Sequence, residues 1–131
     1  MSKTAVAICQ TRIFGGFPEE IHNVRAFVAE LVDGCPAADD VALLSSEVAT
    51  NAILHSASGA AGTFSVSVLA GRGSVRVEVH DLGSATAPSV RRSRQPGESG
   101  AGLSLVEKLS DRWGFDGGEH GRVVWFEMDG Q

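Results

Sequence analysis

The chain has 131 residues, of which 43% are hydrophobic, and carries a formal net charge of -5 at pH 7. This length suits a single domain over residues 1–131, and the negative charge argues against nonspecific nucleic-acid binding. No run approaches the roughly 18 apolar residues that span a bilayer, and residues 4–8 are too short for a signal peptide, so we expect a cytoplasmic protein with no membrane or direct nucleic-acid partner.

The first half of the chain is expected to form one strand followed by two helices. Residues 4–14 have the composition of a strand, which the glycines at positions 15 and 16 should end. Pro18 suits the first turn of a helix, and the apolar spacing over residues 21–31 continues this helix to a stop at Gly34. A second helix is expected over residues 39–56. Its apolar residues cover three sides, so it should be packed on several faces.

The second half is expected to be mainly strands. Residues 64–68 and 75–79 alternate between apolar and polar, and the turn at 71–73 should join them into a hairpin with one face buried. A loop over residues 83–100 has little apolar content. The remaining elements are a helix at about 101–110, a short strand at 113–115, a turn at Gly117-Gly118 and a strand at 122–128. This order predicts an α+β fold, a two-layer sandwich with helices on one face of a mixed, mostly antiparallel sheet.

Glu47, Asn51 and His55 form a polar stripe on the otherwise apolar second helix. Residues spaced in this way lie on one side of a helix, each about one turn from the next. A solvated strip, or a few core polar groups satisfied by their neighbours, would also produce this pattern. Because Glu is almost never fully buried without a partner, the stripe needs either water or a ligand, and it is the first candidate site.

Asp81 is the second polar anomaly. It shares strand parity with Val75, Val77 and Val79, so it should point with them toward the helix layer. An inward carboxylate at the end of a strand can accept a hydrogen bond from the amino group of a ligand in a dry setting. A simple turn residue is the alternative interpretation, since Asp is common near Gly at strand ends.

The third feature is the glycine-rich run at 97–103, Gly-Glu-Ser-Gly-Ala-Gly-Leu, which leads directly into a helix. Free amides at a helix start favour phosphate, as does the helix dipole. The run is no P-loop, since no Lys-Ser or Lys-Thr follows, and no dinucleotide-binding fingerprint, since a long loop precedes it. A flexible hinge is the alternative. The two cysteines and the dispersed histidines have no zinc-binding spacing.

Together, in this order and spacing, the three features resemble the N box, the D-x-G box and the G-x-G-L box of the GHKL ATPase superfamily. Residues 45–56 and 109–115, the latter reading Leu-Ser-Asp-Arg-Trp-Gly-Phe, are similar to small stand-alone ATP-binding proteins of actinobacteria that are related to anti-sigma factor serine kinases. The resemblance extends over about residues 17–128. It implies the Bergerat fold, with ATP and Mg2+ held between sheet and helices under a lid at about 84–99.

The resemblance also implies a role for each motif residue. Asn51 would coordinate Mg2+ through its side-chain oxygen, and Glu47 would be the general base that takes the proton of an attacking serine hydroxyl. Asp81 would accept a hydrogen bond from the exocyclic amine of adenine, and Gly83 would let the base approach the backbone. The remaining nucleotide-binding residues would be Gly97, Gly100, Gly102 and Leu103.

Some positions depart from the pattern or leave it open. Ala85 replaces a glycine that many relatives have after the D-x-G box, and Arg122-Val123 supplies no hydroxyl where relatives tend to place a threonine. Arg91, Arg92 and Arg94 would offset phosphate charge if the lid closed over it, while a solvated cluster in a loop is the alternative.

The function that the resemblance implies is that of an anti-sigma factor-type protein serine kinase in a partner-switching pathway. Its partners would be a STAS-type anti-anti-sigma protein, phosphorylated on serine, and a sigma factor, and the type admits a homodimer. The alternative is a binding module of the same pathway, with or without nucleotide, that has no kinase activity. ATP hydrolysis coupled to motion is disfavoured, since no transducer domain is evident.

Overall fold

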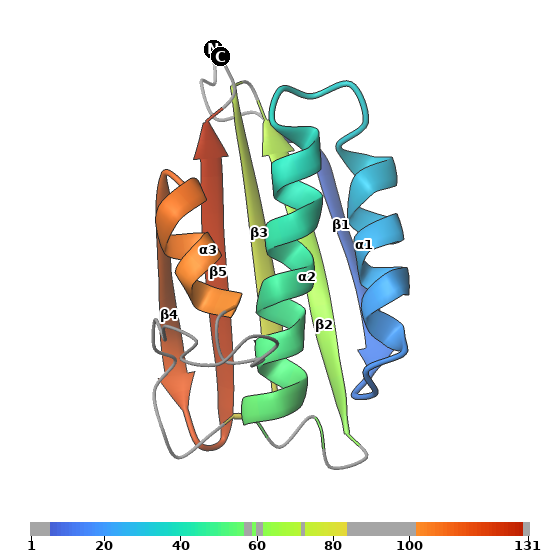
Figure 1. The fold of residues 1–131 in the computed structure, drawn as a ribbon, viewed down its shortest axis with the longest axis vertical. Helices are drawn as coiled ribbons and strands as arrows, with labels where there is room; N and C mark the ends of the chain where they lie inside the picture. The colour runs from blue at the N-terminus through green and yellow to red at the C-terminus, as the bar shows by residue number, and fades with distance from the viewer. Residues whose placement is uncertain (1–5, 57–58, 60–61, 72, 84–101, 130–131) are drawn as a thin grey trace.

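The computed structural model describes residues 6–56, 59, 62–71, 73–83 and 102–129. Within them, three helices lie on one face of a five-stranded sheet, as Figure 1 shows. The elements in chain order are β1 (Val6–Gly15), α1 (Glu20–Leu31), α2 (Ala38–His55), β2 (Thr63–Gly71), β3 (Ser74–Asp81), α3 (Gly102–Leu109), β4 (Arg112–Gly118) and β5 (Gly121–Asp129).

The strand order across the sheet is β1-β2-β3-β5-β4, and each neighbouring pair is antiparallel. The last strand, β5, therefore lies between β3 and β4 and forms a ladder with each of them. This position matters for the site, because it places the start of β5 directly beside the end of β3. The predicted α+β class, with helices on one face of the sheet, is confirmed.

Side-chain alternation explains which face of the sheet is covered. Val66 of β2 pairs with Val79 of β3, which in turn pairs with Val124 of β5, and all three are buried against the helices. Along each strand, the residues that alternate with these valines point to the opposite, uncovered face of the sheet. On that face Arg76 forms ion pairs with Glu78 and Glu127. A sheet with one dry face and one polar face is what the period-2 pattern of the sequence predicts.

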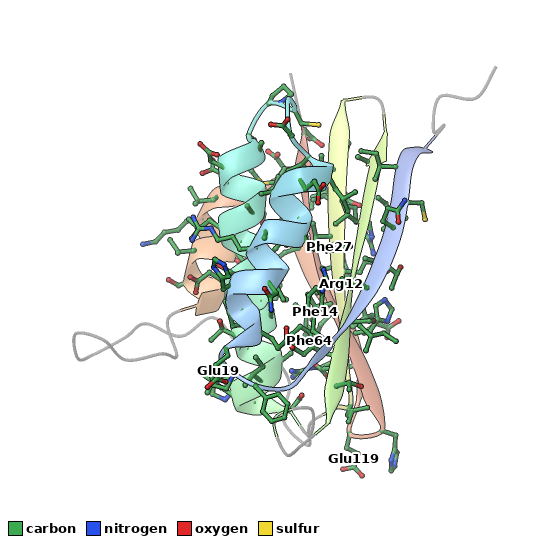
Figure 2. The ribbon with its side chains drawn as sticks, turned by 90° about the vertical axis from the view of Figure 1, so that its right-hand side faces the viewer. Arg12, Phe14, Glu19, Phe27, Phe64 and Glu119 are labelled. Atoms are coloured by element: carbon green, nitrogen blue, oxygen red, sulfur yellow. The ribbon has the colours of Figure 1, made fainter. Side chains whose placement is uncertain are left out.

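An aromatic cluster fastens the first strand and first helix to the sheet. Phe14 of β1 stacks on Phe64 of β2 with ring centroids 5.7 Å apart and meets Phe27 of α1 edge-on at 5.9 Å. Figure 2 shows these rings between the helix layer and the sheet. The guanidinium of Arg12 lies 5.1 Å from the centroid of the Phe14 ring. Such ring pairs add directional attraction to the burial of apolar area.

The central helix α2 packs against α1, α3 and the sheet, as predicted from its apolar surface. The buried apolar side chains along one side of this helix are those of Val41, Leu44, Val48 and Ala52. Its hydroxyl side chains donate hydrogen bonds to carbonyls of the same helix, at 2.8 Å from Ser45, 2.7 Å from Ser46 and 2.7 Å from Thr50. None of the helices in the described residues is both long enough and apolar enough to cross a membrane.

The last hairpin corrects one prediction. Gly117-Gly118, expected as a turn, lies within β4, and the turn falls instead at residues 119–120. The backbone of Gly117 has a φ of 94°, and a Cβ there would collide with the carbonyl oxygen of Gly121. Glycine therefore serves close approach of the two strands rather than reversal of the chain. This extends β4 beyond the expected 113–115.

Replacement of Phe64 by alanine should destabilise the fold strongly. Its side chain is 2% exposed and stacks on Phe14, so a cavity would remain where the ring was. We expect Phe64→Ala to lower the free energy of unfolding by about 3–5 kcal/mol. Urea denaturation followed by circular dichroism measures this change. Phe17→Ala is the matched control, because that ring is 52% exposed, and an equal loss in both variants would contradict the assignment of Phe64 to the core.

Candidate functional site

Three segments that the sequence singled out converge near one end of the molecule. Figure 1 shows three segments toward the same end of the molecule: the C-terminal turns of α2, the end of β3 and the β4–β5 turn. The first residues of α3 lie at the end of that helix nearest to these segments. Contacts link α2 to α3 and α2 to β3. The fold therefore brings the polar stripe of α2 and Asp81 into one region of the structure.

Asn51 is the most informative residue of the stripe. Its side-chain nitrogen Nδ2 is buried and has no hydrogen-bond partner within the described part of the chain. Leaving a buried amide donor unpaired costs about 1–3 kcal/mol, and buried polar groups almost always find a partner. The neighbouring hydroxyls on α2 all donate to backbone carbonyls, so Asn51 is the exception on this helix. An unpaired buried carboxamide is a reason to expect a ligand at this point.

Glu47 lies about one turn before Asn51 on the same side of α2 and is only partly buried. Burial raises the pKa of its carboxyl group above the ordinary value, and the positive charge of Arg25 on α1 lowers it in part. Loss of water around a carboxylate disfavours its charged form, which makes it a stronger proton acceptor once ionised. His55, in the last turn of the helix, is exposed.

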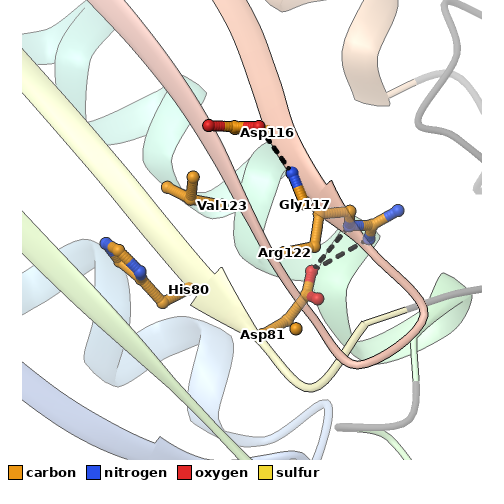
Figure 3. Close-up of a pocket in the computed structure, with 7 residues that line it drawn as sticks. His80, Asp81, Asp116, Gly117, Arg122 and Val123 are labelled. Carbon is orange, nitrogen blue, oxygen red and sulfur yellow. Dashed lines mark hydrogen bonds and ion pairs between the residues drawn. The ribbon is translucent and has the colours of Figure 1, made fainter.

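Asp81 points inward, as strand parity predicts, but it already has partners. Its Oδ2 accepts hydrogen bonds from Nε and Nη2 of Arg122, at 3.1 and 2.9 Å, as Figure 3 shows. Its Oδ1 accepts a hydrogen bond from the backbone N–H of Gly83 at 2.7 Å. The Asp81 and Arg122 side chains are 0% and 2% exposed. The end of β3 therefore carries a buried ion pair.

Gly83 is held in place by this arrangement. Its φ of +97° lies in the region that favours glycine, and its N–H closes a short turn on Asp81. A Cβ at this position would meet the carbonyl oxygen of Gly118 at 2.5 Å and the backbone nitrogen of Gly121 at 2.6 Å. The absence of a side chain thus lets the end of β3 pack against the β4–β5 turn. Its expected role beside a base stays a prediction.

Arg122 is the residue that sequence reasoning missed as a partner. The signal was present, since Arg122 shares parity with Val124, Phe126 and Met128, which face the core. An inward arginine requires a carboxylate, because a buried charge without a partner is very costly. The partner follows only from the register, in which β3 and β5 place Asp81 directly opposite Arg122. That pairing belongs to the tertiary structure, because α3 and β4 lie between the two strands in the sequence.

A pocket of about 370 Å3 opens near this ion pair. Figure 3 shows it at the end of β3 and along the β4–β5 hairpin. Its lining residues are His80, Asp81, Asp116, Gly117, Gly121, Arg122 and Val123. His80, Val123 and Asp116 are cross-strand neighbours on the uncovered face of the sheet. Glu47 and Asn51 do not line it, so this pocket is distinct from the polar stripe of α2.

The glycine-rich run is described only in part. Gly102 begins α3, and Leu103 is buried in the core, which anchors the start of this helix. Gly97, Gly100, Ala85, the three arginines at 91, 92 and 94 and the expected lid at 84–99 lie outside the described residues. Their assigned roles stay predictions.

The donor groups of the site fit a magnesium nucleotide better than a metal ion held by protein alone. Among the described residues, no three His, Cys, Asp or Glu side chains lie close enough to hold a metal. Mg2+ usually takes only one or two protein ligands and completes its shell with water and phosphate oxygens. The oxygen of Asn51 is a suitable hard ligand, and its unpaired Nδ2 would have a phosphate oxygen to donate to.

The structure thus combines helices on one face of an antiparallel sheet with a carboxylate and an unpaired amide one turn apart on the central helix. Residues 16–128 match the histidine kinase-like ATPase domain family, and the chain belongs to it. Domains of this family bind ATP, typically with Mg2+.

Comparison with solved structures supports this fold. The crystal structure of the RsbU and RsbW domains of Rv1364c from Mycobacterium tuberculosis is similar, with a TM-score of 0.69 and 20% sequence identity over 95% of this chain. The chain spans only 32% of the length of the chain in that structure. A search of curated proteins found no match.

Glu47→Gln should stabilise the fold at neutral pH. Because burial raises the Glu47 pKa, ionised Glu47 destabilises the folded chain, and the wild type loses stability as pH rises from 4.5 through the raised value. Glutamine carries no charge, so the free energy of unfolding of the variant should exceed that of the wild type at pH 7 and approach it below pH 4.5. Urea titrations at both pH values measure this. Glu30→Gln, at an exposed position on α1, is the control, and a pH-independent difference for Glu47→Gln would refute the assignment.

Removal of one member of the buried ion pair should be costly. We expect Arg122→Met to lower the free energy of unfolding by about 3–5 kcal/mol, since it leaves Asp81 buried and uncompensated. The double variant Asp81→Asn/Arg122→Met should lose less than the sum of the two single variants. Arg112→Met is the matched control, because that side chain is 51% exposed and solvent screens its ion pairs, so this variant should lose far less stability than Arg122→Met. Strict additivity in the cycle would show that the pair is not coupled.

Proposed function

We propose that this chain is a protein serine kinase of the anti-sigma type that uses Mg2+ and ATP in a partner-switching pathway. The observation that carries the proposal is the buried, unpaired carboxamide of Asn51 one turn from the partly buried Glu47. Because the chain belongs to a family of ATPase domains, ATP is the ligand that we assign to this pair of groups. The likeness to a structure that contains an RsbW domain supports the choice of pathway.

The division of work between the two side chains follows from their chemistry. Bound Mg2+ and ATP would supply the phosphoryl group and neutralise its charge. Asn51 would hold that assembly through its oxygen, with Nδ2 donating to a phosphate oxygen. Glu47 would accept the proton of the acceptor serine while the serine oxygen bonds to the terminal phosphorus and ADP departs. The raised pKa of Glu47 suits this role, provided that the carboxyl is ionised at the working pH.

The proposed partners are an anti-anti-sigma protein of the STAS class, phosphorylated on serine, and a sigma factor. Pairing of two copies of this chain is part of the same proposal. Support for this level of detail comes from the motif resemblance and from the domain name of the similar structure. Gly102 and Leu103 at the start of α3 would lie at the phosphates, with Gly97 and Gly100 preceding them.

A second candidate function is a partner-switching module that binds its protein partner without phosphotransfer. The ion pair between Asp81 and Arg122 favours it, because the carboxylate that would select adenine is already engaged. A tight complex with a STAS-domain protein that shows no phosphorylated serine in the presence of Mg2+ and ATP would decide for this candidate.

The roles of Asn51 and Glu47 can be separated by substitution. Calorimetric titration of ATP with and without Mg2+ should show Mg2+-dependent binding that Asn51→Ala loses. The control is Asn23→Ala, an exposed amide on α1 that donates to Glu20. Equal binding by wild type and Asn51→Ala, with or without Mg2+, would contradict the metal assignment.

Glu47→Gln should lose chemistry and keep binding. We expect its rate of phosphotransfer to a STAS-domain protein to fall by at least about 100-fold, since a positioned general base contributes about 10²–10⁴-fold. ATP affinity should change little, because the shape of the side chain is retained. Radiolabelled phosphotransfer and calorimetry measure the two effects. A parallel loss of affinity and rate would assign Glu47 to binding instead.

A further inference from the structure

At the base end of the proposed nucleotide site, Arg122 binds the carboxylate of Asp81, the group expected to contact the base. Each oxygen of Asp81 is already engaged, Oδ1 by the N–H of Gly83 and Oδ2 by two nitrogens of Arg122. Both side chains of the ion pair are almost fully buried. Three of the roughly four acceptor positions of this carboxylate are therefore taken, and its burial leaves no exposed acceptor for an amino group of a ligand.

This pair differs from the other ion pairs in the described part of the chain. Those have exposed or partly exposed side chains, such as Arg112 with Asp129 and Arg76 with Glu127. Asp81 and Arg122 instead face each other across adjacent strands on the helix side of the sheet. Ladder hydrogen bonds on β3 and β5 hold the two backbones in register, so the pair is a built feature of the sheet and not a chance surface contact.

The geometry points to Arg122 as a residue that determines base selectivity, and this inference rests on the nucleotide site proposed above. With Arg122 in place, Asp81 is withdrawn from the base, and the site holds the triphosphate through Asn51 and the start of α3. Discrimination by the carboxylate between adenine, whose amino group needs an acceptor, and guanine, which carries a carbonyl at that position, is thereby lost. The wild type should therefore bind ATP and GTP with similar affinity.

The test is calorimetric titration of Mg2+ with ATP, GTP and inorganic tripolyphosphate into the wild type and Arg122→Thr. For the wild type, the dissociation constants of ATP and GTP should agree within about threefold. Arg122→Thr frees Oδ2 of Asp81, so it should prefer ATP by about tenfold or more, the effect of one hydrogen bond to a charged acceptor. Affinity for tripolyphosphate, which has no base, should be unchanged.

Two further variants isolate the cause. Asp81→Asn/Arg122→Thr should lose the preference for ATP, since the freed carboxylate is gone. Arg112→Thr removes the same charge from an exposed position on the far face of the sheet and should leave the ratio of ATP to GTP affinity at the wild-type value. If circular dichroism shows that Arg122→Thr does not fold, Arg122→Lys replaces it. Its single amino group cannot reproduce both nitrogen contacts, so its ratio of ATP to GTP affinity should exceed the ratio measured for the wild type by about threefold, and an unchanged ratio would overturn the role of Arg122.

The outcomes are distinct. A wild type that prefers ATP by about tenfold or more, or a folded Arg122→Thr that binds tripolyphosphate but gains no preference, would overturn the role of Arg122. Failure of all the proteins to bind tripolyphosphate, ATP and GTP would instead overturn the nucleotide site itself, and the inference with it.

Discussion

The burial of α2 between α1, α3 and the sheet is the constraint on which the rest of the structure depends. Polar side chains on a helix that is covered on several faces have little contact with water. Each must therefore form hydrogen bonds within the protein or with a ligand. The hydroxyls of Ser45, Ser46 and Thr50 take the first course. Asn51 and Glu47 do not, and their position follows from helical spacing alone. The site is therefore a consequence of how the core is built.

The two ends of the proposed nucleotide site differ in whether their polar groups already have hydrogen-bond partners. At the α2 end, the amide of Asn51 lacks a described partner, and burial raises the pKa of the Glu47 carboxyl. At the β3 end, the carboxylate of Asp81 is already satisfied by Arg122 and Gly83. In the proposed site, the phosphate end would therefore hold an unpaired amide, and at the base end Arg122 would keep the Asp81 carboxylate engaged.

Local patterns predicted a large part of the fold. Period-2 alternation located β2 and β3, and helical spacing located α1 and α2 to within a few residues. Strand parity placed Asp81 on the dry face. The error at Gly117-Gly118 arose because glycine serves both turns and close strand contacts, and local sequence does not distinguish the two. The order β3-β5-β4 is equally non-local, since it depends on which strand reaches which edge.

By itself the sequence determined that Glu47 and Asn51 share one side of the second helix and that Asp81 shares a strand face with Val75, Val77 and Val79, because periodicity decides which side of an element a residue occupies. Only the tertiary structure decided which of them lack partners. Arg122 reaches Asp81 because β5 inserts between β3 and β4 in one register, and a shift by one residue would turn its side chain to the other face. Among the described residues, none provides a hydrogen-bond partner for Nδ2 of Asn51. Pairing between distant segments is set by the global packing of the chain, and so it decides which polar groups remain open to a ligand.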